Sequence, residues 1–366
     1  MEYPDIAIFF GRPVRSHILA EQLRRKGFRV TLYNTRGLPG TYVSIPRTFL
    51  PALCRLFPTH HQIYLTSYSS FPALCLYLNR IIRGLPYVFN AVGLMSPTYH
   101  DRSRRWPCPG LAARGLYPAL TDRVLGGASC IVCNSRYLQR ELASEFPHYA
   151  HKMSTIYNGI DVARFTSGQP IALNGIPAEA KKLLAVMTWD YEAKASGARL
   201  LIDAMGLIAE RYPEARLIIA AKARHQRYVH ANETYLATRP WREAIKIYYN
   251  YANIPALLAS SDLFVYATPP KSNDSVPRAL LEAHAAGLPI VTTATAGCPE
   301  VVEDRVTGFV VPYEAKALAH HVADLLAAPG QRQEFGRRGQ RRIQEVFSWD
   351  RMAESYASLF LQMISN

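Results

Sequence analysis

Two acidic side chains stand eight positions apart where the sequence SNDSVPRALLEAHAAGLPIV, residues 272–291, passes from a polar loop into a helical pattern. Asp274 lies in the loop, and Glu282 lies about two turns inside the expected helix. The first N–H groups of a helix are unpaired and its dipole is positive there, so a helix start binds anions. A phosphate at this point would bring hydroxyl-bearing parts of the same ligand near both carboxylates, as a nucleotide-sugar site requires. The alternative is that Asp274 is a solvated loop acid and Glu282 a surface residue of the helix. The pair alone does not decide between this alternative and a ligand site.

The ends of this helix carry recognisable signals. Ser275 is a suitable N-cap residue, and Pro277 suits the first turn, where its missing N–H costs nothing. Gly287 and Pro289 mark the other end. The spacing therefore predicts a helix over residues 276–287.

Short apolar runs alternate with helical patterns along the whole chain. The first strand is followed by an amphipathic helix and a second strand, which is the order of a βαβ unit in a parallel sheet. The first series of expected strands covers residues 5–10, 28–34, 61–67, 85–92, 128–135 and 153–159. A second series covers residues 183–189, 215–222, 245–250, 262–268 and 289–295. We expect an α/β protein of two doubly wound, Rossmann-like domains facing a central cleft.

The length of 366 residues also suits two domains rather than one. We assign residues 1–162 to an N-terminal Rossmann-like domain and residues 163–345 to a C-terminal Rossmann-like domain. Residues 346–366 contain a clean amphipathic helix. The pattern alone does not state where this helix packs.

Positive charge is concentrated in the first half of the chain. Residues 1–165 contain 20 Lys and Arg against 8 Asp and Glu, whereas the remainder contains 22 against 20. A generally basic surface does not explain this asymmetry, which indicates an anionic partner such as a membrane surface or an acidic lipid-linked substrate. No nucleic-acid-binding module is recognisable, so nucleic acid is not an expected partner. The start, MEYPDIAIFF, lacks a secretory pattern, and no run is apolar enough to span a bilayer. We expect a cytoplasmic protein, at most peripheral on the inner face of the membrane.

Cys130 and Cys133 form a C-x-x-C pair inside the strand pattern ASCIVCNS. Side chains three apart in a strand point to opposite faces, and no second pair or His cluster completes a metal site. We therefore expect two buried structural cysteines and no metal.

Four ordered segments resemble family-4 retaining glycosyltransferases. Residues 273–312, NDSVPRALLEAHAAGLPIVTTATAGCPEVVEDRVTGFVVP, are similar to the family signature of two glutamates flanking seven residues, a small-residue helix and a G-x-PE segment. TIYNGIDVARF, ASCIVCNSRYLQREL and ANIPALLASSDLFVYAT resemble the family's entry to the second domain, an NS segment and a strand lead-in. The resemblance covers nearly the whole chain and implies the GT-B fold and a metal-independent transferase without a cofactor. It also implies that the first domain, residues 1–162, binds the acceptor and that the second domain, residues 163–345, binds the nucleotide-sugar. The helix in residues 346–366 is then expected to cross back and pack on the first domain.

The resemblance also implies roles for individual residues on the donor side. Glu282 would bind the ribose hydroxyls, and Asp274, one methylene shorter than the family's glutamate, would bind the donor sugar. Lys194 stands at the position of the lysine that contacts the diphosphate, whereas Thr188 stands where an arginine is usual. Lys271 and Arg278 are candidate replacements for that arginine. The predicted catalytic residues are Asp274 and Lys194; the predicted nucleotide-binding residues are Gly11, Thr188, Ser275, Val276, Arg278 and Glu282.

The expected acceptor side departs further from the family pattern. Phe10-Gly11 keeps one glycine of the usual pair, and Val92 occupies the usual histidine position. His100 either substitutes for this histidine or is a surface residue. The segment SPTYHDRSRRWPCPG suits an anionic interface or a phosphorylated acceptor, or else forms a solvated loop. The acceptor-side candidates are His100, Arg102, Arg104 and Arg105.

These observations predict a retaining hexosyltransferase that moves a sugar from a nucleotide-sugar to a lipid-linked or cell-surface glycan, as in lipopolysaccharide or exopolysaccharide biosynthesis. Thr188, Val92 and Phe10 motivate an alternative, a catalytically impaired homologue acting as a partner subunit. A nucleotide-sugar epimerase of the same fold is a third hypothesis. An epimerase would convert the donor without an acceptor.

Overall fold

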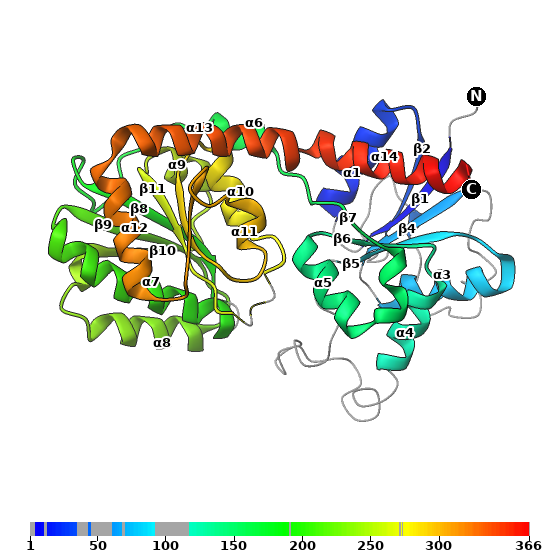
Figure 1. Cartoon of the computed structure of the whole chain (residues 1–366), viewed down its shortest axis with the longest axis horizontal. Helices are drawn as coiled ribbons and strands as arrows, with labels where there is room; N and C mark the ends of the chain where they lie inside the picture. Colours follow the sequence, from blue (N-terminus) through cyan, green and yellow to red (C-terminus); the bar gives the residue numbers. More distant parts are fainter. Residues whose placement is uncertain are drawn as a thin grey trace. The chain divides into compact units, whose positions relative to one another are not determined.

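The computed structural model describes residues 4–10, 13–34, 43–44, 61–67, 70–91, 117–189, 192–270, 272 and 274–365. The chain divides into two compact units, one made of Met1–Gly159 and Trp349–Asn366 and the other of Ile160–Ser348 (Figure 1). Each unit contains a parallel sheet with helices on its faces. Several predicted residues lie outside the described part of the chain: Gly11, Val92, His100, Arg102, Arg104, Arg105 and Lys271.

The sheet of the first unit has the strand order β3-β2-β1-β4-β5-β6-β7, and all of its pairings are parallel. Its strands are β1 Asp5–Phe10, β2 Arg29–Asn34, β3 Val43–Ser44, β4 Ile63–Ser67, β5 Tyr87–Ala91, β6 Cys130–Cys133 and β7 Met153–Thr155. Its helices are α1 Pro13–Arg25, α3 Ser70–Arg83, α4 Tyr117–Gly127, α5 Arg136–Glu145 and the 3-10 helix η2 Pro147–Lys152. The six strands predicted for this half are confirmed.

Alternate strand residues point to two separate cores in this unit, as expected for a doubly wound sheet. Ile6 and Ile8 pack on one face with α1, whereas Ala7 and Phe9 pack on the other with α3, α4 and α5. Cys130 belongs to the core on the α1 side of the sheet, and Cys133 belongs to the core on the side of α3, α4 and α5; both are buried. Burial raises the pKa of the Cys133 thiol to about 12, so it stays protonated. The prediction of two structural cysteines on opposite faces is therefore confirmed.

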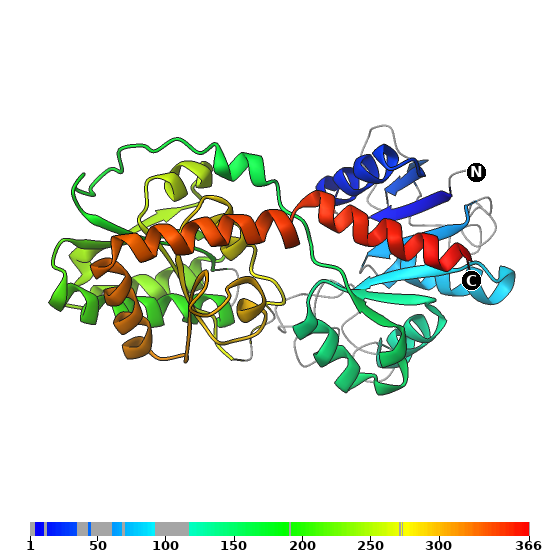
Figure 2. The same cartoon turned by 45° about the horizontal axis from the view of Figure 1, so that its top comes forward.

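The C-terminal helix α14, Trp349–Ser365, completes the core on the α1 side. It lies beside α1 (Figure 2). Its residues Met352, Tyr356 and Phe360 are buried against the strands. This confirms the prediction that the helix packs on the first domain. The first residue of α14, Trp349, lies directly against Gly159. A Cβ on Gly159 would lie 2.7 Å from the Cα of Trp349, so only glycine fits at this point.

The sheet of the second unit has the order β10-β9-β8-β11-β12-β13 and is also parallel throughout. Its strands are β8 Lys181–Thr188, β9 Ala215–Lys222, β10 Ile245–Tyr249, β11 Leu263–Tyr266, β12 Ile290–Thr293 and β13 Gly308–Val311. Its helices are α6 Val162–Thr166, α7 Glu192–Arg211, α8 Gln226–Ala237, α9 Ile254–Ala259, α10 Arg278–Ala285, α11 Cys298–Val301, α12 Ala315–Ala327 and α13 Pro329–Val346, with a 3-10 turn η3 at Arg242–Ala244. The five strands predicted for this half are confirmed, and β13 adds a sixth.

The start of α10 differs from the prediction. The helix begins at Arg278 with Pro277 as its N-cap residue, and no side chain caps it, so the N-cap role predicted for Ser275 is wrong. Proline fixes the backbone before the helix but leaves Ser275 too far upstream to reach the first free N–H groups. The end follows the prediction: Gly287 has φ +82°, and Leu288 N–H donates to the Ala283 carbonyl at 3.0 Å, which forms a Schellman motif.

In the described part of the chain, no helix is both long enough and apolar enough to cross a membrane.

Candidate functional site

The carboxylate of Asp274 is held at the carboxyl end of β11. The side chain is buried, with Asp274 only 8% exposed. The Tyr266 hydroxyl, at the end of β11, donates to Oδ2 at 2.9 Å, and the Thr268 hydroxyl donates to the same oxygen at 3.1 Å. The backbone is fixed as well, because Asp274 N–H donates to Ser272 Oγ at 3.1 Å and Gly297 N–H donates to the Asp274 carbonyl at 2.9 Å. The loop therefore presents one carboxylate in one orientation.

Lys194 reaches this carboxylate from the first turn of α7. Its ammonium pairs with Asp274 Oδ1 and donates to the Tyr266 hydroxyl at 3.1 Å. Gly197, one turn later, explains the approach: a Cβ there would lie 2.2 Å from the Ala267 carbonyl oxygen, so only glycine lets α7 come this close to the end of β11. Burial lowers the pKa of Lys194 to about 8, and the nearby Cys298 opposes this shift to a smaller extent. The lysine is thus mainly charged at neutral pH.

Glu282 forms a second carboxylate group inside α10. Its side chain is 13% exposed, and Arg278 Nε, one turn earlier, donates to Oε1 at 2.7 Å. Burial raises the pKa of Glu282, while the charges of Arg278 and Arg164 oppose this shift. The solvated alternative considered for both acids is wrong, because Asp274 and Glu282 are both largely buried.

The other predicted donor-side residues occupy the same end of the sheet with less defined contacts. Ser275 is buried and packs on Gly297, where a Cβ would lie 1.6 Å from the Ser275 carbonyl oxygen. Val276 is half-buried. The Thr188 hydroxyl donates to the Lys222 carbonyl at 3.3 Å and so joins the ends of β8 and β9. The structure therefore brings Asp274 and Lys194 into direct contact, whereas Thr188 is bound to a neighbouring strand.

Several site residues were not found from the sequence. Besides Tyr266 and Thr268, a buried set of hydroxyls ties the β11 end to the β12 end. Thr295 Oγ1 donates to the Thr268 carbonyl at 2.7 Å, and Thr293 Oγ1 accepts from Thr268 N–H at 3.2 Å. The available signal was the run of hydroxyl-bearing residues directly after two buried strands, in VYAT and IVTTAT, since ligand sites in open α/β sheets lie at the carboxyl ends of the strands.

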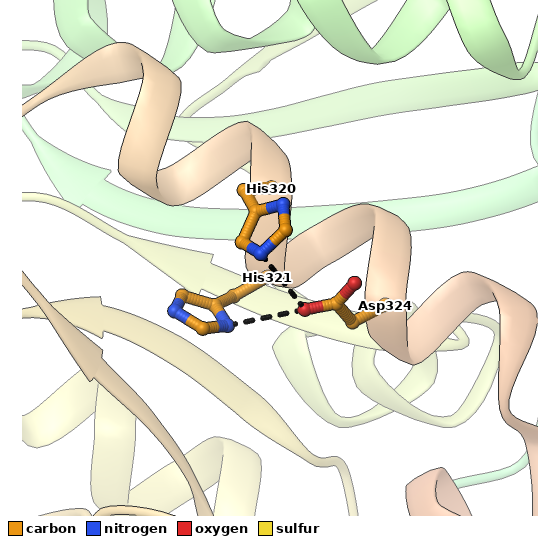
Figure 3. A group of neighbouring side chains, drawn as sticks. All are labelled: His320, His321 and Asp324. Carbon is orange, nitrogen blue, oxygen red and sulfur yellow. Dashed lines mark ion pairs between the residues drawn. The ribbon is translucent and has the colours of Figure 1, made fainter.

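A separate group of side chains on α12 could hold a metal ion (Figure 3). Asp324 Oδ2 lies 3.6 Å from His320 Nε2 and 3.3 Å from His321 Nδ1, and among the described residues this is the one such group found. The His321 ring stacks on Phe309 with centroids 4.5 Å apart. These distances also suit ordinary His–Asp pairs one turn apart on a helix surface. The group shares no residue with the Asp274 and Glu282 contacts, so we assign it no role in their chemistry.

Comparison with known proteins agrees with this architecture. The model of Glycosyltransferase Family 4 matches residues 14–164, and the model of Glycosyl transferases group 1 matches residues 180–328. Spore coat protein SA of Bacillus subtilis is 28% identical over 245 residues, which are 63% of this chain and 64% of that protein. The chain thus spans somewhat less than two thirds of that relative's length.

Solved structures with low sequence identity share the fold. A glycosyltransferase from Rickettsia africae superimposes with a TM-score of 0.77 at 15% identity, with all of both chains covered. Anabaena HepE in complex with UDP gives a TM-score of 0.74 at 17% identity, covering 98% of this chain and all of that one. Two Rossmann-like units of this kind define the GT-B class. The chain belongs to the family-4 glycosyltransferases.

Proposed function

We propose that this protein is a retaining glycosyltransferase that moves a sugar from a nucleotide-sugar to a lipid-linked or cell-surface glycan acceptor. The observation that carries the proposal is the contact of the Lys194 ammonium with Asp274 at the carboxyl end of β11, with Glu282 following in α10. This arrangement supplies one cation and two acceptors to a ligand that carries both phosphates and hydroxyls.

In this proposal the nucleotide-sugar binds to the second unit. Glu282 accepts hydrogen bonds from the ribose, Lys194 contacts the diphosphate, and Asp274 accepts from the donor sugar. Ser275, Val276 and Arg278 stand at the start of α10, where backbone N–H groups favour an anion. The complex of Anabaena HepE with UDP supports a nucleoside diphosphate as the ligand class.

In this proposal the Lys194 ammonium supports transfer of the sugar without a metal or a cofactor. Departure of the nucleotide leaves negative charge on the diphosphate, and a buried ammonium stabilises that charge more strongly than an exposed one. In a front-face reaction the departing phosphate takes the proton of the acceptor hydroxyl, so no separate protein base is required. The anomeric configuration is then retained.

A membrane-associated acceptor is supported by the first unit. Ile81 and Ile82 at the end of α3 are 61% and 64% exposed, and the exposed residues Arg80 and Arg83 flank them. Exposed aliphatic side chains next to arginines suit the interface of an anionic bilayer. Together with the excess of positive charge in residues 1–165, this supports a peripheral attachment to the inner face of the membrane.

The proposal is tested by binding and by product analysis. Thermal-shift measurements with uridine, guanosine, thymidine and adenosine diphosphates and their sugars should show stabilisation by one nucleotide family. Glu282→Ala should abolish the shift, whereas Glu210→Ala, an exposed carboxylate on α7, should preserve it. Incubation of the selected donor with vesicles containing lipid-linked glycan should then give an α-linked product from an α-linked donor. A cooperative melting transition that no nucleotide shifts would refute the proposal.

A further inference from the structure

The carboxylate of Asp274 has both of its oxygens engaged before any donor is bound. Oδ1 is paired with Lys194, and Oδ2 accepts from Tyr266 and Thr268. A buried carboxylate requires such partners, because an unpaired charge away from water is strongly unfavourable. Oδ2 thus has two donors, whereas Oδ1 accepts from Lys194, so a donor hydroxyl that reaches Asp274 meets it on the side that Lys194 occupies.

Lys194 is engaged in a similar way. Its ammonium has three N–H groups, of which one is directed to Tyr266 and another to Asp274. The side chain is 11% exposed and carries a single positive charge. A nucleotide diphosphate carries two negative charges in its sugar-linked form, so it competes with Asp274 for the same cation.

These contacts suggest an exchange of partners, and the inference rests on the proposed donor site. We propose that donor binding transfers Lys194 from Asp274 to the diphosphate, while a hydroxyl of the donor sugar takes its place on Asp274 Oδ1. Tyr266 and Thr268 are positioning residues that hold Oδ2 during the exchange. No covalent bond changes in this step, and the ammonium keeps its proton.

The exchange distinguishes the donor from the product nucleotide. A nucleotide-sugar supplies both a phosphate for Lys194 and a hydroxyl for Asp274, so neither charge is left without a partner. After transfer, the nucleoside diphosphate has no sugar hydroxyl, so a Lys194 that stays on it leaves Asp274 Oδ1 without the partner that the nucleotide-sugar supplied. The site therefore favours the nucleotide-sugar over the nucleoside diphosphate, which promotes release of the product.

Asp274→Asn tests the exchange, because the amide has the shape of the carboxylate but no charge. Calorimetry measures the affinity of the wild-type protein for the nucleoside diphosphate and for the nucleotide-sugar that stabilise it most. The ratio of these two affinities is the preference for the nucleotide-sugar. The preference for the nucleotide-sugar should fall by about tenfold in the variant, as expected for loss of a hydrogen bond to a charged group. Asp203→Asn is a matched control on the same helix as Lys194: Asp203 also accepts from a tyrosine, Tyr235, at 2.6 Å and pairs with a basic side chain. It should leave the preference unchanged.

Two further measurements make the test independent of one variant. The pKa of Lys194, obtained from the pH dependence of its labelling by an amine reagent, should fall in Asp274→Asn, since the paired carboxylate favours the ammonium. If Asp274→Asn does not fold, Tyr266→Phe keeps all charges and should reduce the preference by a smaller factor.

The outcomes separate the two proposals. A wild-type protein that binds both ligands, with a preference unchanged in both Asp274→Asn and Tyr266→Phe, overturns the exchange and leaves the proposed function in place. An unchanged Lys194 pKa in Asp274→Asn overturns it as well. A wild-type protein that binds no nucleotide overturns the proposed function together with the exchange.

Discussion

The affinity for the donor should decrease as the pH rises above neutrality, because Lys194 must be charged to contact the diphosphate. Burial lowers the pKa of Lys194 from 10.5 to about 8. The ammonium is therefore present below this value and is lost as the pH rises through it. The direction of the effect follows from the lowered pKa, since a lysine with an ordinary pKa would stay charged throughout the same pH range.

The size of the effect follows from the fraction of charged lysine. A group with a pKa of about 8 is ~90% protonated at pH 7 and ~10% protonated at pH 9, which gives a dissociation constant about tenfold larger at the higher pH, or about 1.4 kcal/mol. Calorimetric titration with the nucleotide-sugar over this range measures it. The nucleotide-sugar is the better probe, because the terminal phosphate of a nucleoside diphosphate itself titrates near neutrality.

Lys194→Arg is the control for this experiment. A guanidinium stays charged at every pH used, so any remaining pH dependence in the variant belongs to other groups. The variant should bind more weakly than the wild type at pH 7 but with a nearly constant affinity up to pH 9. Equal affinity of the wild-type protein at pH 7 and pH 9 would refute the role of Lys194 as the diphosphate cation.

Other expectations follow from contacts around the site. Gly297→Ala should abolish nucleotide binding, because its Cβ would lie 1.6 Å from the Ser275 carbonyl and displace the Asp274 loop; Gly330→Ala, with open space around its Cβ, should bind normally in the same thermal-shift assay. His284 is fully buried with a pKa lowered to about 4 by desolvation, so the unfolded chain binds its proton first as the pH falls through about 6.5. The free energy of unfolding should therefore fall by about 2 kcal/mol from pH 7 to pH 5 in urea titrations, and His284→Gln should remove that part of the pH dependence. Finally, chelation of divalent ions by EDTA should leave the affinity for the nucleotide-sugar within about twofold of its original value, since a cationic side chain supplies the charge; a loss of tenfold or more would indicate a metal.

The sequence predicted the strands well because their signals are local. The run ARLIIAAK, for example, is apolar on both faces and has the same bounds as β9, as expected for a strand covered on both sides. The bounds of α10 were less accurate at the start. Pro277 is typical of the first turn, yet here it is the N-cap residue, and only the backbone conformation distinguishes the two positions.

The site was only partly predictable. Asp274, Lys194 and Glu282 were predicted from their positions in a family pattern. The contact between Asp274 and Lys194, however, joins residues 80 positions apart and depends on how closely α7 approaches β11. Tyr266 was missed, because an aromatic residue at the end of an apolar strand is more often part of the core. Its role appears only when the hydroxyl is found between a lysine and an aspartate.

The position of α14 has a consequence for the order of events during synthesis. Met352, Tyr356 and Phe360 fill a core whose other members are the strands and α1 of the first unit, yet they are made after all of Ile160–Ser348. The first unit emerges early from the ribosome but lacks one wall of its core until the last helix is made. The second unit has all of its own elements sooner and can fold before it. The first unit would meanwhile expose apolar surface, and a chaperone that acts during translation would be expected to bind there.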